Sequence, residues 1–102
     1  MLERVPLYEE VVTVNNSVVT LKSLLAGAAF KPGVNRCTVH NIDPSNNVEI
    51  RYLATGTPAS GAMDVLVPDA DKTLEWGAEK LAKVYVYAAA ATKLNVLQEG
   101  LG

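Results

Sequence analysis

Two segments of the chain alternate between hydrophobic and polar positions with a period of two. Within Val48–Leu53, the residues Val48, Ile50 and Tyr52 alternate with two charged residues. Lys83–Leu97 opens with a similar alternation and lies close to the end of the sequence. Successive side chains of a β-strand point to opposite faces of its sheet, so this period predicts strands with one buried face.

Turn residues separate further segments that are rich in β-branched residues. The strands expected from this pattern are Tyr8–Val14, Ser17–Leu21, Arg36–Ile42, Val48–Leu53, Met63–Val67, Thr73–Trp76, Lys83–Ala89 and Thr92–Gln98. A single helical turn is expected over Ser23–Ala29, where Gly27 disfavours a longer helix. Ala78–Ala82 is expected to be either a turn of helix or a connecting arm. About seven or eight short strands predict an all-β fold. We expect a single small antiparallel β-sandwich, of jelly-roll or immunoglobulin-like type, with minor helix.

Two hairpins are expected between neighbouring strands. Asn15 and Asn16 both tolerate a positive φ and can close a tight turn, although an irregular link is the alternative there. The turn residues Asp43–Asn47 make Arg36–Leu53 the second expected hairpin. Residues 1–102 are predicted to form one domain, with an extended N-terminal arm over about residues 1–8 and a short C-terminal tail over about residues 98–102.

Composition narrows the classes of function. The chain has 102 residues, of which 49% are hydrophobic, and this is enough for one globular core. Its 9 Lys and Arg are scattered among 11 Asp and Glu, which predicts no direct nucleic-acid binding by charge. No apolar run has the roughly 18–20 residues needed to cross a bilayer. The first ten residues lack the apolar stretch of a signal peptide, so we expect folding in the cytoplasm.

The reactive side chains do not form a recognisable catalytic or metal site. Cys37 and His40, the one cysteine and the one histidine, lie three apart and would point to opposite faces of a strand. A catalytic triad needs a nucleophile beside a base, and no G-x-S-x-G motif is present. Asp64, Asp69 and Asp71 lack the spacing of a calcium loop. We therefore predict a protein that is not an enzyme and has no cofactor, with Cys37 buried as a small hydrophobic residue.

The aromatic residues indicate where contacts form. Phe30 and Trp76 are expected to anchor the core. Tyr85 and Tyr87 share one face of their strand, and valines occupy the other, so both faces are apolar or amphipathic. Either this strand is central and covered on both sides, or its tyrosine face contacts a second subunit, as tyrosines often do. The segment Thr55–Ala62 is either a plain inter-strand loop or a tip that contacts a partner.

Four short motifs between residues 48 and 97 carry a resemblance to a known group of proteins. They are Ile50-Arg51-Tyr52, Gly56-Thr57-Pro58, Ser60-Gly61 and Leu94-Asn95-Val96. With these motifs the chain resembles small all-β structural proteins of tailed-bacteriophage virions. The resemblance implies a capsid decoration (cement) protein, made in the host cytoplasm and located on the virion, that stabilises the shell by bridging capsid subunits.

The partners implied are the major capsid protein and further copies of the chain, in a homo-oligomer on the particle. The candidate interface residues are Tyr8, Thr57, Pro58, Tyr85, Tyr87 and Leu101. Two alternatives remain open. One is a neck or tail accessory protein. The other is a β-sandwich module that binds a receptor or glycan, in which Trp76, Tyr85 and Tyr87 would form an exposed platform.

Overall fold

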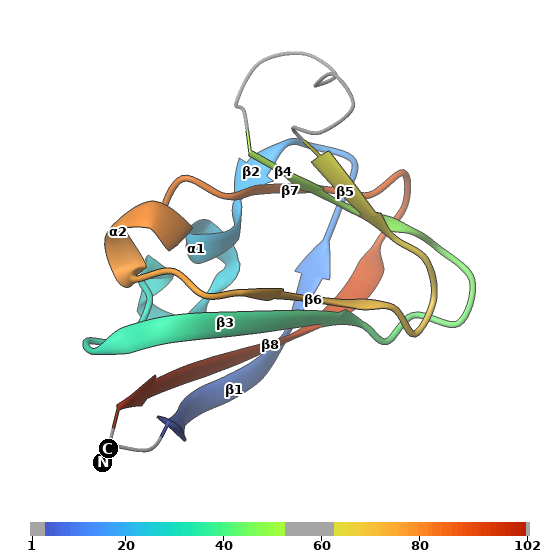
Figure 1. Ribbon diagram of the computed structural model, residues 1–102. Helices are drawn as coiled ribbons and strands as arrows, with labels where there is room; N and C mark the ends of the chain where they lie inside the picture. The colour runs from blue at the N-terminus through green and yellow to red at the C-terminus, as the bar shows by residue number, and fades with distance from the viewer. Residues whose placement is uncertain (1–3, 53–62, 102) are drawn as a thin grey trace.

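The computed structural model describes residues 4–52 and 63–101, and these residues form two four-stranded antiparallel sheets packed face to face (Figure 1). The first sheet has the order β1 (Arg4–Val14), β8 (Thr92–Leu101), β3 (Val34–Asn41), β6 (Asp71–Leu74). The second sheet has the order β2 (Val19–Thr20), β7 (Tyr85–Tyr87), β4 (Val48–Arg51), β5 (Met63–Leu66). Three short helical segments, α1 (Leu21–Leu24), η1 (Ala26–Ala28) and α2 (Ala78–Leu81), complete the described elements. The expected all-β sandwich with minor helix is therefore confirmed.

The strand pairing identifies the type of sandwich. β1 pairs with β8, β2 with β7, β3 with β6 and β4 with β5, all antiparallel. The first half of the chain thus pairs with the second half in reverse order. Two further pairings, β3 with β8 and β4 with β7, join these four ribbons into two sheets. This is the connectivity of a jelly roll, which was one of the two sandwich types that the sequence predicts.

Both hairpins expected from the sequence are wrong. β1 and β2 lie in different sheets, and so do β3 and β4. The links between them cross from one sheet to the other instead of folding back within a sheet. Alternation along a strand identifies its buried face, but it contains no information about which other strand lies alongside. The irregular link at Asn15 and Asn16, which was the alternative to a tight turn, is the one that forms.

Asn41 stabilises the link that crosses from β3 in the first sheet to β4 in the second. Its side chain is fully buried at the end of β3. The amide Nδ2 donates to the backbone carbonyls of Asn46 and Leu66, each at 2.8 Å, and Oδ1 accepts from the backbone N–H of Asp43 at 2.9 Å. The side chain therefore ties the end of β3, in the first sheet, to the turn that follows it and to β5 in the second sheet.

The two ends of the described chain pair with each other. β1 already begins at Arg4, whose partner in β8 is Leu101, so residues 4–8 and 98–101 are strand and not a separate arm and tail. Gly100 allows a close approach at this edge, because a Cβ there would lie 2.5 Å from the carbonyl oxygen of Gly33. Gly33 itself has a φ of +85°, which favours glycine.

The core lies between the sheets and consists mainly of valine and leucine. Cys37 is fully buried as expected, and burial raises the pKa of its thiol to about 12. Phe30 is also buried, whereas Trp76 is only partly buried and packs against the margin of the core. The buried polar Gln98 accepts a hydrogen bond from the backbone N–H of Lys31. The buried hydrophobic residues are Val12, Val14, Leu21, Leu25, Phe30, Val34, Cys37, Val39, Val48, Ile50, Leu66, Leu74, Leu81, Val84, Val86, Ala88, Leu94 and Val96.

Candidate interaction surface

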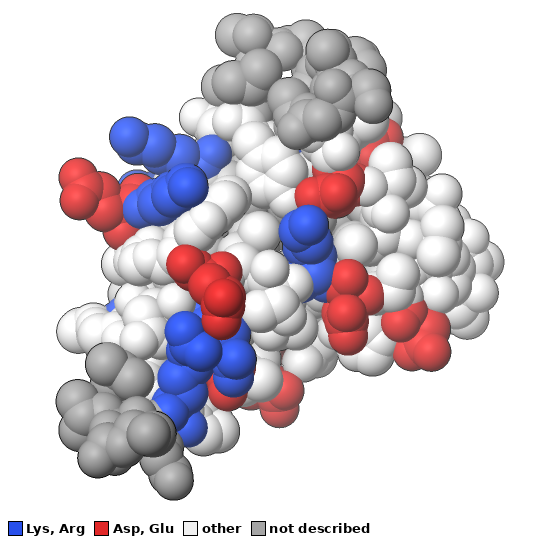
Figure 2. All heavy atoms as spheres, in the orientation of Figure 1, with Lys and Arg blue, Asp and Glu red and all other residues white. Residues whose placement is uncertain are grey.

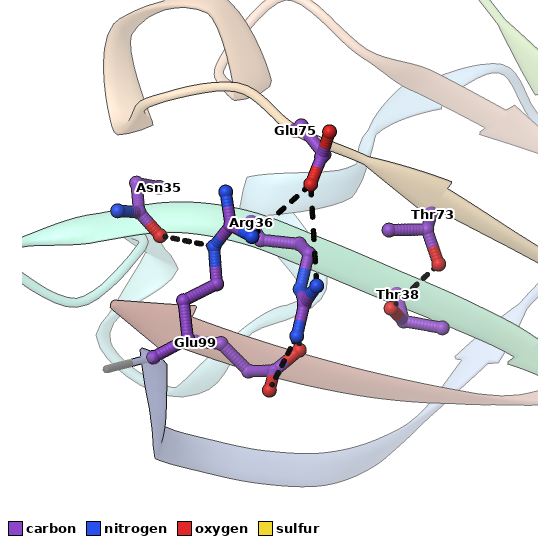
Figure 3. Close-up of polar contacts among 7 residues, drawn as sticks. Asn35, Arg36, Thr38, Thr73, Glu75 and Glu99 are labelled. Carbon is purple, nitrogen blue, oxygen red and sulfur yellow. Dashed lines mark hydrogen bonds and ion pairs between the residues drawn. The ribbon is translucent and has the colours of Figure 1, made fainter. Parts of the chain in front are cut away.

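The outer face of the first sheet is largely polar, and several of its charges form ion pairs. Arg36 on β3 binds the carboxylate of Glu99 on β8 through two hydrogen bonds of 2.9 and 3.1 Å (Figure 3). Glu75 lies 3.1 Å from the guanidinium of Arg4 and 3.9 Å from that of Arg36. The hydrogen bond from Arg36 holds the pKa of Glu99 below its ordinary value. Figure 2, which views the sandwich from the side with one sheet above the other, shows acidic and basic side chains close together on this side of the molecule.

The outer face of the second sheet has a different character. β7 lies between β2 and β4, and its central residue Val86 is fully buried in the core. Because side chains alternate along a strand, Tyr85 and Tyr87 point to the outer face, where both are half-buried. The structure thus brings these two predicted interface residues together on one face of the sheet.

A partly buried ion pair lies beside the tyrosines on this face. Arg51 and Glu49 on β4 are the cross-strand partners of Tyr85 and Tyr87, respectively. The guanidinium Nη2 of Arg51 is 2.6 Å from Oε1 of Glu49, and the guanidinium carbon is 4.8 Å from the centre of the Tyr87 ring. The two charges neutralise each other, and the arginine also gains a cation–π contact. Covering this face with a partner would therefore bury no net charge from the pair.

Exposed valines border the tyrosines. Val65 on β5 pairs with Glu49 and is 49% exposed, and Val67 just after β5 is 52% exposed. Val18 precedes β2 directly and is 38% exposed. Alternation along β5 places Val65 on the outer face of the second sheet, and Val18 and Val67 directly adjoin β2 and β5. We call the surface formed by Val18, Glu49, Arg51, Val65, Val67, Tyr85 and Tyr87 the tyrosine–valine face.

The other predicted interface residues do not join this face. Tyr8 belongs to β1 in the first sheet, pairs with the buried Gln98, and has its ring 4.5 Å from the ammonium of Lys31. Leu101 pairs with Arg4 through the backbone at the end of β8. Thr57 and Pro58 lie outside the described residues.

Sequence reasoning missed most of the tyrosine–valine face. One signal was available at Glu49 and Arg51, because opposite charges two residues apart on a strand share a face and can pair. Another was available at Val65 and Val67, which flank the buried Leu66. Both pairs lie beside Tyr85 and Tyr87 because of the order of the strands in the sheet. The hydrophobic pattern within a single strand does not predict that order.

The platform of Trp76, Tyr85 and Tyr87 that a receptor-binding module would need is not formed. Trp76 packs edge-on against Tyr52, with ring centres 5.7 Å apart. Tyr52 follows β4 on the same side as the buried Ile50, whereas the cross-strand partner of Tyr85 is Arg51 on the opposite side. Trp76 therefore lies on the inner side of the second sheet, whereas the two tyrosines lie on its outer face.

Residues 4–52 and 63–101 contain no group of three or more His, Cys, Asp or Glu side chains placed to hold a metal ion. No helix in this part of the chain is long and apolar enough to span a bilayer. Comparisons with protein-family models, with curated proteins and with solved structures give no match. The tyrosine–valine face is therefore the feature from which a function is inferred.

Proposed function

We propose that this protein is a structural protein without catalytic activity, which packs the tyrosine–valine face against another protein subunit. We further propose that the assembly is a bacteriophage virion, and that the protein decorates the capsid and bridges neighbouring capsid subunits. The partners on this proposal are the major capsid protein and copies of the chain itself.

The observation that carries the proposal is the composition of the tyrosine–valine face. The centres of protein interfaces are enriched in tyrosine and arginine and depleted of unpaired charge. This face combines Tyr85 and Tyr87 with an arginine whose charge Glu49 already neutralises. Burying a valine completely contributes about 1.5–3 kcal/mol, so covering the half-exposed Val65 and Val67 would contribute about 1 kcal/mol each.

Two further points support the virion as the site of assembly. One is that the jelly roll recurs in viral capsid proteins. Lectins and cupins share this fold, so the argument is one of analogy between folds. The other is the resemblance of the motifs between residues 48 and 97 to virion structural proteins. A protein that binds only the assembled shell stabilises that shell by mass action, and such a role needs no chemistry.

Copy number and shell binding test this proposal. In purified phage particles, quantitative mass spectrometry should find hundreds of copies of the chain, in fixed proportion to the major capsid protein. About a dozen copies or fewer would instead indicate a neck or tail protein, and absence from the particle would refute the virion assignment.

A matched pair of variants tests the face itself. Val65→Asp places a charge on the tyrosine–valine face, whereas Val11→Asp places one on the outer face of the first sheet, at a valine of similar exposure (53%). Val65→Asp should abolish binding to undecorated shells, and Val11→Asp should leave it unchanged. Equal binding by both variants would rule out this face as the interface.

A further inference from the structure

A cleft lies beside α2, on the opposite side of the second sheet from the tyrosine–valine face. Its walls are the rings of Tyr52 and Trp76. The buried Val84 and the exposed Lys80 and Lys83 also line it. The cleft has a volume of about 170 Å³ and adjoins a wider hollow of about 360 Å³, which shares the two lysines with it. We call it the Trp76 cleft.

The walls of the cleft are held in place by contacts on their far side. The hydroxyl of Tyr52 donates to Oδ2 of Asp64 at 2.5 Å, and the ammonium of Lys72 lies 3.5 Å from the same oxygen. Burial and the bond to Asp64 raise the pKa of Tyr52, so this hydroxyl stays neutral. Trp76 packs edge-on against the Tyr52 ring. The negative charge of Asp64 is thus paired with Lys72 and not with Lys80 or Lys83.

The two lysines give the rim of the cleft its charge. Trp76 precedes α2, Lys80 lies in its last turn and Lys83 follows it, and all three line the cleft. The ammonium of Lys80 lies 4.2 Å from the centre of the Trp76 ring. Neither lysine has an ion pair with a described residue, and Glu79, which lines the wider hollow, is the acidic side chain there. Figure 2 shows this mixture of basic and acidic side chains over α2.

We propose that the Trp76 cleft binds an acidic peptide segment of a partner protein, in which an apolar side chain lies next to carboxylates. The apolar side chain packs between Trp76 and Tyr52 above Val84, and the carboxylates approach Lys80 and Lys83. A peptide fits better than a sugar, because the Tyr52 hydroxyl is already bonded to Asp64 and the lining offers few polar groups for sugar hydroxyls. This inference rests on the cleft alone and is independent of the proposed virion role.

The indole N–H of Trp76 offers a direct test, since the chain has one tryptophan. The ¹⁵N-labelled protein is titrated with the peptide Ac-Asp-Leu-Glu-NH₂ and separately with its neutral counterpart Ac-Asn-Leu-Gln-NH₂. The acidic peptide should shift the indole signal saturably and bind at least about fivefold more tightly than the neutral one, and added salt should narrow this difference. Equal binding of the two peptides, or no saturable shift, would overturn the proposal.

Charge variants on the rim give the second readout. Lys80→Gln and Lys83→Gln should each weaken binding of the acidic peptide about two- to fivefold, whereas Glu79→Gln should strengthen it about twofold. Lys93→Gln, on β8 in the other sheet, is the matched control and should change nothing. Unchanged affinity in both rim lysine variants would contradict the proposal, as would saturable binding of glucuronate in place of the peptide.

Discussion

Replacing Asn41 with alanine removes a side chain that satisfies three backbone groups at the crossing between the sheets. The carbonyls of Asn46 and Leu66 each lose a donor, and the N–H of Asp43 loses its acceptor. A buried polar group left without a partner costs about 1–3 kcal/mol. With water restoring some of these bonds, we expect the free energy of unfolding to fall by about 3–4 kcal/mol, a large part of the roughly 5–15 kcal/mol typical of a domain.

Urea denaturation followed by circular dichroism measures this loss. With a slope of about 1.5 kcal/mol per molar urea, the midpoint of Asn41→Ala should lie about 2–3 M below that of the wild type. Hydrogen exchange adds a local readout, because the amide of Asp43 should exchange much faster in the variant.

The matched control is Asn95→Ala in the neighbouring strand β8. Asn95 lies on the outer face and donates one exposed hydrogen bond of 3.0 Å to Glu9, so its loss should cost less than about 1 kcal/mol. If Asn41→Ala lost no more stability than Asn95→Ala, with an unchanged slope, the buried amide would not be holding the crossing as described.

Two further predictions concern close packing and pH. Gly100→Ala should lower the melting temperature by about 10 °C, because the new Cβ would meet the carbonyl of Gly33. Gly77→Ala is the control and should change the melting temperature little, because the nearest atom to its new Cβ is 3.9 Å away. Equal effects of the two substitutions would refute the close approach at Gly100. The lowered pKa of Glu99 means that its ion pair stabilises the folded protein above the ordinary glutamate pKa of about 4.3 and is lost as the pH falls further. Melting temperatures measured from pH 6 to about 3 should therefore fall less steeply in Arg36→Gln than in the wild type, and identical slopes would contradict this linkage.

Much of the fold follows from local pattern. Alternation with a period of two places Tyr85 and Tyr87 on one face of their strand and Val86 on the other, because successive side chains of a strand point to opposite faces whatever its neighbours are. A buried Cys37 was predicted separately, because a free cysteine without a partner behaves as a small hydrophobic residue. The part of the interaction surface that lies within one strand, the two tyrosines of β7, was therefore predictable.

Strand order was not predictable in the same way, and the rest of the candidate surface depends on it. The turn at Asp43–Asn47 is equally compatible with a hairpin and with a crossing between sheets. The hydrogen bond from Asn41 to the carbonyl of Leu66 is formed in the crossing between sheets, and Leu66 lies 25 positions away in the chain. The sequence alone assigned Trp76 to the core, whereas its contacts with Tyr52 and Lys80 place it at the edge of a cleft.

By itself, the sequence determined an all-β domain and showed which side chains of a strand share a face, Tyr85 and Tyr87 among them. These properties depend on backbone geometry over a few residues. Only the tertiary structure decided that the sandwich is a jelly roll, that Glu49, Arg51 and Val65 lie beside those tyrosines, and that a cationic cleft forms at Trp76. Each of these depends on contacts between residues far apart in the chain, whose free energies act only once the strands are paired.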